Sequence, residues 1–528
     1  MTKQGWILLL IVMLGGYLRV INLEKNPPSL GNDEISIAYD SYSMRAIGLD
    51  EHGKSWPLSF QSHQTYKAPL YAYLNMPLSK LLGNTEYGVR LLSAIAGVGA
   101  IVFIVMIGKE LISINFGLMA GLLLAINPRA IFASRIAFES NLAMTIMLVG
   151  VWAMIVFIKS RKNIYLVWAG VFLGLSIWGY HTEWGLVPML AIVWIWLSWE
   201  KIKLNKWWPM LSLIILLAAP IYIDFMKVQV MDPNNRASSQ LWFSSGQFKD
   251  YLKNSQDSQL KKSINLVMTP VYSYISHFSL DTNFSSGGNL FNSRGPLING
   301  WYLLFTLPLL VVGLLNINKI FGQWANNVLS WWLLCPVIPS LTGEVASVRN
   351  LAFIIPTTLI IAGGAKIIYE KSYKVGMVLA LFITFNFFIF TRAYYVHYPL
   401  DAGDNFQYGY KQAWEFIRPN IDKYSRVVVE NRFGRVGEFV GVPHLYFGYY
   451  GAFTPQEMQK RIDINGTKIG KYEFKYVDWN LEIYTPDTIY IVSAINPEAG
   501  LIANSLKEIG IIRNTNNEVQ FLIYESVE

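Results

Sequence analysis

The sequence predicts a polytopic α-helical membrane protein followed by a small α/β domain. Of its 528 residues, 53% are hydrophobic and only 15% are charged, which is unusual for a water-soluble domain. Apolar segments long enough to cross a hydrocarbon layer of about 30 Å recur from the N-terminus to residue 391. Beyond residue 391 the pattern changes to short, strand-like apolar runs.

The apolar segments predict about eleven transmembrane helices, because each is long and carries few charges. The first one lacks a small-residue cleavage site and is interpreted as a retained helix rather than a signal peptide. The predicted spans are 5–22, 90–108, 113–127, 138–158, 164–180, 184–199, 208–223, 298–316, 324–341, 351–367 and 374–391.

Three short basic connections orient these helices. Residues 159–163, 198–208 and 366–374 are rich in Lys and Arg, so the positive-inside rule places them in the cytoplasm. Counting spans outward from them places the loops 23–89 and 224–297 and everything after 392 on the extracytoplasmic side. We therefore expect a multi-pass protein of the plasma membrane, with residues 1–391 as its transmembrane domain.

The external segments differ in character. The first loop contains DEISIAYDSYSMRAIG, whose apolar spacing predicts an amphipathic helix lying on the membrane interface. The tail, 392–528, has strand-like runs at 425–430, 487–494 and 521–527, and a helical pattern at 409–421. It is predicted to be an extracytoplasmic α/β domain. Its removal is expected to alter the choice of acceptor more than the turnover of the donor.

Composition also excludes some functions. The single Cys335 allows no intramolecular disulfide and no cysteine metal site. The net charge of +8 comes largely from the cytoplasmic loops and gives no indication of nucleic acid. His63, His181 and His277 have no ligand-like spacing, so no metal site is predicted from them.

Ionisable residues near the outer helix ends are the candidates for chemistry, because burying a charge there is costly without a purpose. Carboxylates among them could take a proton, and cations could hold a phosphate. Each also has an ordinary structural explanation: a helix cap, a snorkelling cation, or an i, i+4 pair between Arg135 and Glu139. The candidates are Asp33, Glu34, Lys67, Arg90, Arg135 and Glu139.

The order of these residues resembles a known family. The runs SLGNDEISIAY, KAPLYAYL, EYGVRLLSAIAG and AINPRAIFASRIAFESN resemble the start of GT-C glycosyltransferases, in particular protein O-mannosyltransferases and the lipid A aminoarabinose transferase. HFSLDTNF and IPSLTGEVASVRNLAFIIP are similar to later external loops of that family, so the resemblance covers about residues 1–360. Ala68 and Glu139 depart from the family pattern, which more often has proline and, in the lipid A enzyme, aspartate.

The resemblance implies an inverting glycosyltransferase that takes a sugar from a polyprenyl-phosphate carrier. The acceptor would be a protein, a glycolipid or a cell-wall glycan. Asp33 is expected to be the catalytic base, with Glu34 and Glu139 orienting Asp33 or the acceptor, or holding the cations in place. No cofactor is predicted; some relatives use a divalent metal, but no dense carboxylate cluster in this sequence calls for one. The expected donor-phosphate ligands are Lys67, Arg90, Arg135 and Arg349, and the expected substrate-lining residues are Tyr66, Tyr71 and His277, with Trp56 and Tyr73 as further aromatic candidates.

The alternative function is a transporter or flippase for a lipid-linked or anionic solute. Such proteins often show two related halves with charges near the bilayer midplane. This sequence shows no similarity between its halves, and its candidate residues fall on one side of the membrane. Both features favour the transferase.

Overall fold

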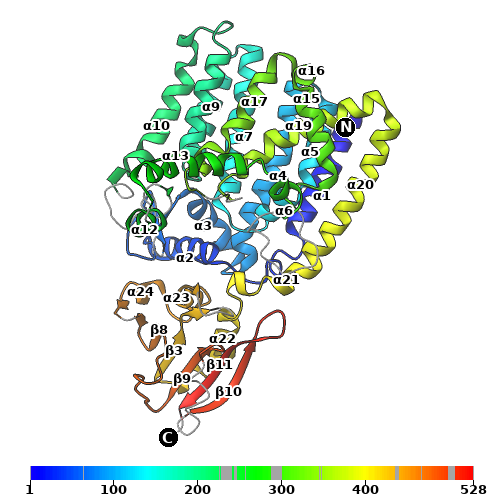
Figure 1. Cartoon of the computed structure of the whole chain (residues 1–528). Coiled ribbons are helices and arrows are strands. Elements are labelled where there is room, and N and C mark those ends of the chain that lie inside the picture. Colours follow the sequence, from blue (N-terminus) through cyan, green and yellow to red (C-terminus); the bar gives the residue numbers. More distant parts are fainter. Residues whose placement is uncertain are drawn as a thin grey trace.

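The computed structural model describes residues 2–62, 65–224, 226–227, 241–242, 246–255, 257–286, 300–343, 345, 348–433, 439–464, 466–496 and 506–526. A bundle of long helices forms the upper part of the molecule in Figure 1, and a sheet region formed by the C-terminal residues lies beneath it. His63 and parts of the predicted 224–297 loop lie outside the described residues.

Helices make up most of the described chain up to residue 401. Some of them begin at a side-chain cap: the Thr85 hydroxyl, for example, accepts the Gly88 N–H at 3.0 Å where α4 begins. The helices before the sheet region are α1 (Lys3–Val20), α2 (Asn32–Ile47), α3 (Leu70–Leu82), α4 (Glu86–Leu111), α5 (Ile114–Ala125), α6 (Pro128–Ser134), α7 (Glu139–Ser160), α8 (Ile164–Ile177), α9 (Glu183–Leu197), α10 (Trp208–Asp224), α12 (Gly246–Asn254), α13 (Gln259–Ser276), α14 (Leu280–Phe284), α15 (Leu307–Leu315), α16 (Ile317–Phe321), α17 (Ala325–Leu334), α18 (Val337–Ser340), α19 (Ile354–Lys371), α20 (Tyr373–Arg392) and α21 (Tyr398–Asp401).

Each of the eleven predicted spans contains a helix, but the predicted number of spans is not confirmed. Among the described residues, 6 helices are long and apolar enough to cross a membrane, or up to 8 if each of two bent pairs is one span. Two more apolar helices, α8 and α9, have only 14 and 15 residues. The chain is a multi-pass membrane protein.

The predicted interfacial helix exists as α2, but its surroundings differ from the prediction. Ten of its residues between Glu34 and Met44 are buried, because α3 packs on it and the C-terminal region covers it. In Figure 1, α2 lies across the lower end of the bundle, between the helices and the sheet region. A short hairpin of β1 (Phe60–Ser62) and β2 (Thr65–Lys67) completes the described part of the first loop.

The C-terminal region is built on a mixed sheet. Its strand order is β10-β11-β9-β3-β8-β7-β6, with β3 parallel to both β8 and β9 and the other pairs antiparallel. Helix α22 (Tyr410–Ile417) and the three predicted strand runs are confirmed as elements. The strands are β3 (Arg426–Glu430), β6 (Ile462–Asp463), β7 (Thr467–Ile469), β8 (Tyr472–Lys475), β9 (Thr488–Ser493), β10 (Leu506–Arg513) and β11 (Val519–Ser526), with a separate pair β4 (Arg432–Phe433) and β5 (Phe439–Val440).

The sheet region and α2 share one hydrophobic core. Ile35 and Tyr39 of α2 belong to the same cluster of buried residues as Phe447 and Val429 of the C-terminal region. The short helices α23 (Pro443–Tyr449) and α24 (Pro455–Met458) both contact α2. The helix that carries the predicted catalytic residues is therefore held from both sides.

Candidate functional site

Asp33 and Lys67 form the centre of the candidate site. Asp33 lies in the first turn of α2, and its side chain is 72% exposed, whereas that of Lys67 is 3% exposed. Lys67 Nζ lies 3.3 Å from Asp33 Oδ1 and donates to the Asp33 carbonyl oxygen at 3.0 Å. Since an ammonium has three N–H donors, one donor remains beyond these two contacts among the described residues. A buried cation thus lies beside a carboxylate that solvent can reach.

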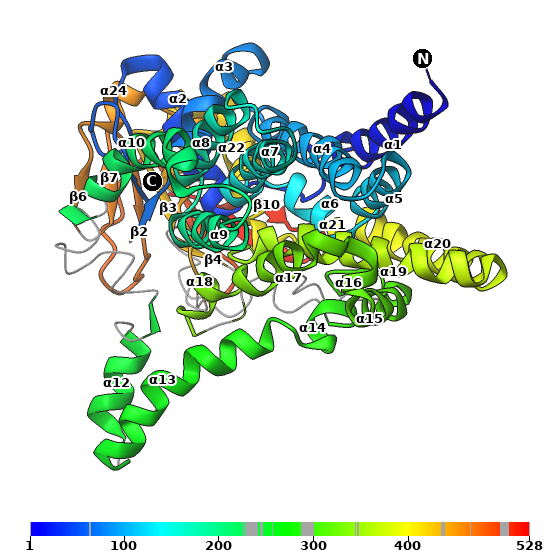
Figure 2. The same cartoon turned by 90° about the horizontal axis from the view of Figure 1, so that it is seen from above.

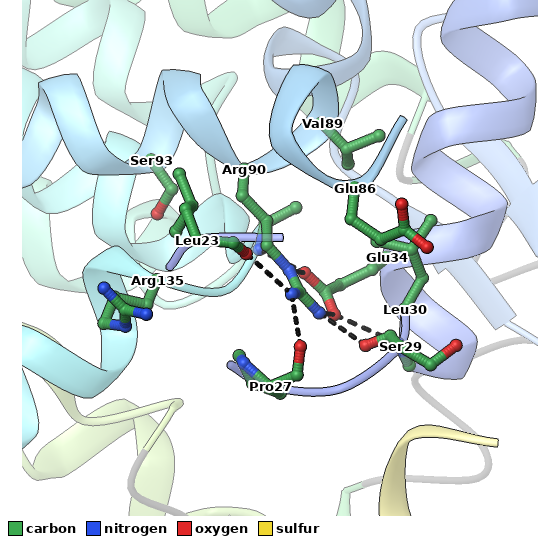
Figure 3. Close-up of polar contacts among 12 residues, drawn as sticks. Leu23, Pro27, Ser29, Leu30, Glu34, Glu86, Val89, Arg90, Ser93 and Arg135 are labelled. Carbon is green, nitrogen blue, oxygen red and sulfur yellow. Dashed lines mark hydrogen bonds and ion pairs between the residues drawn. The ribbon is translucent and has the colours of Figure 1, made fainter. Parts of the chain in front are cut away.

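The Arg90 guanidinium is fully buried, and its hydrogen-bond donors are saturated. Its Nε and Nη2 donate to the two carboxylate oxygens of Glu34 at 2.8 and 2.9 Å. The remaining N–H groups donate to the carbonyl oxygens of Leu23, Pro27 and Ser29 (Figure 3). All five donors of the guanidinium are therefore occupied by protein. This geometry favours a positioning role, and direct phosphate binding by Arg90 remains a prediction.

Glu34 is equally saturated. Besides the two Arg90 bonds, its Oε1 accepts the Ala137 N–H at 2.9 Å and its Oε2 accepts the Gly31 N–H at 3.0 Å. The side chain is 1% exposed. Glu34 therefore joins the start of α2 to α4 and to the segment before α7, and its lone pairs are used for this purpose. The adjacent acids Asp33 and Glu34 therefore lie in different environments: Asp33 is exposed, whereas Glu34 is buried and fully hydrogen-bonded.

Arg135 also binds the segment that precedes α2. It ends α6, is fully buried, and donates to the Leu18, Asn22 and Asn26 carbonyl oxygens at 3.2, 3.3 and 2.9 Å. Because α7 begins only at Glu139, the two residues do not share a helix, and the i, i+4 pair considered from the sequence is wrong. Phosphate binding by Arg135 remains a prediction.

Glu139 and Tyr71 lie close to the Glu34–Arg90 pair. Glu139 is 8% exposed at the first position of α7, two residues after the Ala137 amide that binds Glu34. Tyr71 is fully buried and donates to the Val89 carbonyl oxygen at 2.8 Å. Burial, with the nearby Glu34 charge, raises the pKa of Tyr71 well above its ordinary value, so its hydroxyl stays protonated. Its substrate-lining role remains a prediction.

The other predicted residues fall outside this cluster. His277 is fully buried after α13, where its Nδ1 lies 3.2 Å from Asn350 Nδ2, and Arg349 lies in the adjoining turn. Burial and the nearby Arg129 lower the pKa of His277 to about 3, so the ring is neutral. The substrate roles of His277 and Arg349 remain predictions.

The aromatic candidates differ in how much of each side chain is exposed. Tyr66 is 8% exposed, with Lys54 Nζ 5.4 Å from its ring centre. Trp56 is 61% exposed and stacks on Tyr73, with ring centres 5.5 Å apart. Of these aromatics, Trp56 has the exposed face that a sugar ring could stack on.

A polar contact between the first loop and the C-terminal region had no signal in the sequence. Glu51 Oε1 lies 3.4 Å from His444 Nε2 and 3.3 Å from Arg461 Nη1, and Arg461 Nη2 donates to His52 Nδ1 at 2.7 Å. Burial alone would raise the pKa of Glu51, but His444, His52 and Arg461 lower it to about 2. The Glu51 amide in turn donates to Asp40 of α2 at 3.0 Å. The partners are about 400 positions apart, so only the folded chain shows them together.

Among the described residues, no group of three or more His, Cys, Asp or Glu is placed to hold a metal ion.

Comparisons with known proteins identify the fold. Residues 66–223 match the family model described as dolichyl-phosphate-mannose-protein mannosyltransferase, a range that includes Lys67, Arg90 and Glu139 but not Asp33. No curated protein sequence matches the chain.

Solved structures match over a longer range. ArnT from Cupriavidus metallidurans bound to undecaprenyl phosphate is similar over 99% of this chain and 98% of that chain, at 13% identity and a TM-score of 0.61. The same protein in the apo state gives 13% identity, 98% and 97% coverage, and a TM-score of 0.59. The oligosaccharyltransferase AglB from Archaeoglobus fulgidus, in complex with an inhibitory peptide and a dolichol-phosphate, covers 85% of this chain and 63% of that chain, at 12% identity and a TM-score of 0.50. At these identities the likeness establishes the fold, a helical core followed by a C-terminal sheet region, and it confirms the GT-C resemblance seen in the sequence.

Proposed function

We propose that this GT-C-fold chain, mannosyltransferase-like over residues 66–223, is an inverting glycosyltransferase. It would move a sugar from a polyprenyl-phosphate carrier to an acceptor on the extracytoplasmic face of the plasma membrane. The pairing of Lys67 with Asp33 is the observation that supports this most directly, because it puts a phosphate-binding cation beside an accessible carboxylate. The likeness to a structure with bound undecaprenyl phosphate, over nearly the whole chain, supports the same class of donor.

The proposed reaction is a single displacement at the anomeric carbon. The exposed Asp33 carboxylate takes the proton of the acceptor hydroxyl as its oxygen forms the new bond to that carbon. The bond between the carbon and the phosphate oxygen breaks, and the polyprenyl phosphate leaves with the electron pair. Its growing negative charge is stabilised by the Lys67 ammonium. Glu34 and Arg90 hold α2 in place and take no part in proton transfer.

A donor panel tests this proposal. Purified protein would be incubated with polyprenyl-phosphate sugars, with and without membrane extract as the source of acceptor, and released polyprenyl phosphate would be measured. Release that requires a particular donor and increases with extract is expected for the transferase. Binding of every donor without release would contradict it and favour the transporter.

Replacing Lys67 should weaken binding of the carrier. In Lys67→Ala the phosphate loses a charged donor in a buried setting, so we expect a loss of about 1.5–3 kcal/mol, roughly 10- to 100-fold in Kd. The measurement is a binding titration with polyprenyl phosphate. The exposed Lys54, over the neighbouring Tyr66 ring, provides a matched control as Lys54→Ala. Unchanged affinity in Lys67→Ala would refute the phosphate role.

Removing the C-terminal region should affect donor turnover as well as acceptor choice, although the sequence alone predicts the larger effect on acceptor choice. The reason is that this region shares its core with α2 and binds the loop after it through Arg461. Arg461→Ala is a milder variant, expected to lower the unfolding free energy by about 1–3 kcal/mol and to reduce donor turnover. Thermal unfolding and release assays would be compared with the exposed neighbour variant Lys460→Ala. If truncation after residue 400 leaves donor turnover intact, the C-terminal region acts mainly in acceptor choice, as the sequence predicts.

A further inference from the structure

Helix α13 exposes an apolar face that no described residue covers. Its apolar side chains recur every three to four residues, which places them on one side of the helix. They are largely exposed, with fractions from 41% to 72%. The residues of this face are Leu260, Ile264, Val267, Met268, Val271 and Ile275.

Side chains outside this apolar face hold α13 to the protein. Ser273 is 1% exposed, and the Tyr274 hydroxyl donates to the Leu333 carbonyl oxygen of α17 at 3.0 Å. At the opposite end, Asn265 donates to the Tyr251 hydroxyl at 2.6 Å, which connects α13 to α12. None of these contacts uses a side chain of the apolar face.

The charges of α12 and α13 suit a phospholipid surface. The two helices and their connection carry four lysines and two aspartates, a net charge of +2. Some of these charges are used internally: Lys261 pairs with Asp257 at 2.7 Å, and Lys262 donates to the Leu252 carbonyl oxygen at 2.7 Å. Lys249 and Lys253 of α12 are exposed. Cationic side chains flanking an apolar stripe are the pattern of helices that lie in a membrane interface.

The position of α13 agrees with this chemistry. In Figure 1 it crosses the direction of the spanning helices, at the end of the bundle that faces the sheet region. Figure 2 shows α12 and α13 extending away from the bundle. Helix α10, which is long and apolar enough to cross a membrane, also exposes apolar side chains, Ile215 and Leu216.

We propose that α12 and α13 form a lipid-binding arm. The apolar face of α13 inserts into the acyl region of the leaflet on the side of the C-terminal region, and the α12 lysines contact lipid phosphates. Burial of six apolar side chains in hydrocarbon would stabilise this placement, at about 25 cal/mol per Å² of apolar surface. This inference requires membrane embedding only and does not depend on the proposed transferase activity.

Site-directed fluorescence tests the arm in the intact protein. The only cysteine, Cys335, is 1% exposed, so an introduced cysteine can be labelled selectively, with the unsubstituted protein as the blank. An environment-sensitive dye would be placed at Val267→Cys on the apolar face and at Lys262→Cys, outside that face. Both proteins would be reconstituted in nanodiscs that hold one copy each and, in parallel, in discs that hold two, with and without lipids carrying a spin-label quencher on the acyl chain.

If α13 is inserted in the membrane, the emission of the dye at position 267 should be blue-shifted. The acyl-chain spin label should quench this emission, and aqueous iodide should not. At position 262 iodide should be the stronger quencher. Equal iodide quenching at both positions would show a water-exposed face and overturn the inference. Protection at 267 only when a disc holds two copies would identify a second copy of the chain as the occupant, which also overturns it.

Discussion

Asp33→Asn should abolish sugar transfer while carrier binding is retained. The carboxamide has almost the size of the carboxylate but cannot take a proton from the acceptor hydroxyl, so a loss of about 10²–10⁴-fold in kcat is expected. Lys67 also donates to the backbone carbonyl oxygen of Asp33, a contact that the substitution leaves in place. The variant therefore separates the base from the phosphate site.

Kinetics and binding would be measured together for this variant. A fall in kcat with unchanged Kd for polyprenyl phosphate is the expected pattern for a group that acts in the transition state. Glu24→Gln replaces another exposed carboxylate of the same loop and should have almost no effect. Full activity of Asp33→Asn would exclude Asp33 as the catalytic base and make Glu139 the next candidate.

Breaking the Glu34–Arg90 pair should destabilise the protein more than any other substitution considered. Arg90→Met leaves a buried carboxylate without its cation and frees three backbone carbonyl oxygens, at an expected cost of about 3–5 kcal/mol. Glu34→Gln leaves the guanidinium without its anion, at a similar cost. The reason is burial: both side chains are at most 1% exposed.

Thermal unfolding of the two single variants and the double variant measures this effect. The double variant should lose much less than the sum of the single losses, because neither charge then remains unpaired. The Lys159–Glu110 pair, with side chains 43% and 21% exposed, provides the control: Glu110→Gln should cost about 0–1 kcal/mol. Single variants as stable as the wild type would contradict a structural role and restore Arg90 as a phosphate ligand.

The helices could be predicted from sequence because hydropathy and helix caps act within a few residues. Residues 90–108, for instance, lie inside α4, which begins after its Thr85 cap. The number of spans was harder to predict, because length alone does not show where a helix bends. The pair Leu304–Leu315 and Ile317–Ser340 bends by 77°, although two separate spans were predicted there.

For the candidate site too, some features could be predicted from the sequence and others could not. The sequence placed Asp33, Lys67, Arg90 and Glu139 on one side of the membrane, because spacing and span parity are properties of the chain itself. Which of two adjacent acids is saturated and which is exposed depends on Arg90, 56 positions away from Glu34, and on the Ala137 amide. No local pattern contains that information.

The sequence by itself determined a membrane-embedded helical protein with a C-terminal sheet region, and it predicts a set of acids and cations at one membrane face. Only the tertiary structure decided that Glu34 and Arg90 bind each other, that Asp33 faces solvent beside Lys67, and that the C-terminal region covers α2. The physical reason is the separation along the chain of the residues that determine each property. Hydropathy is read from neighbouring residues, whereas burial and hydrogen-bond partners are set by segments that meet only when the chain has folded.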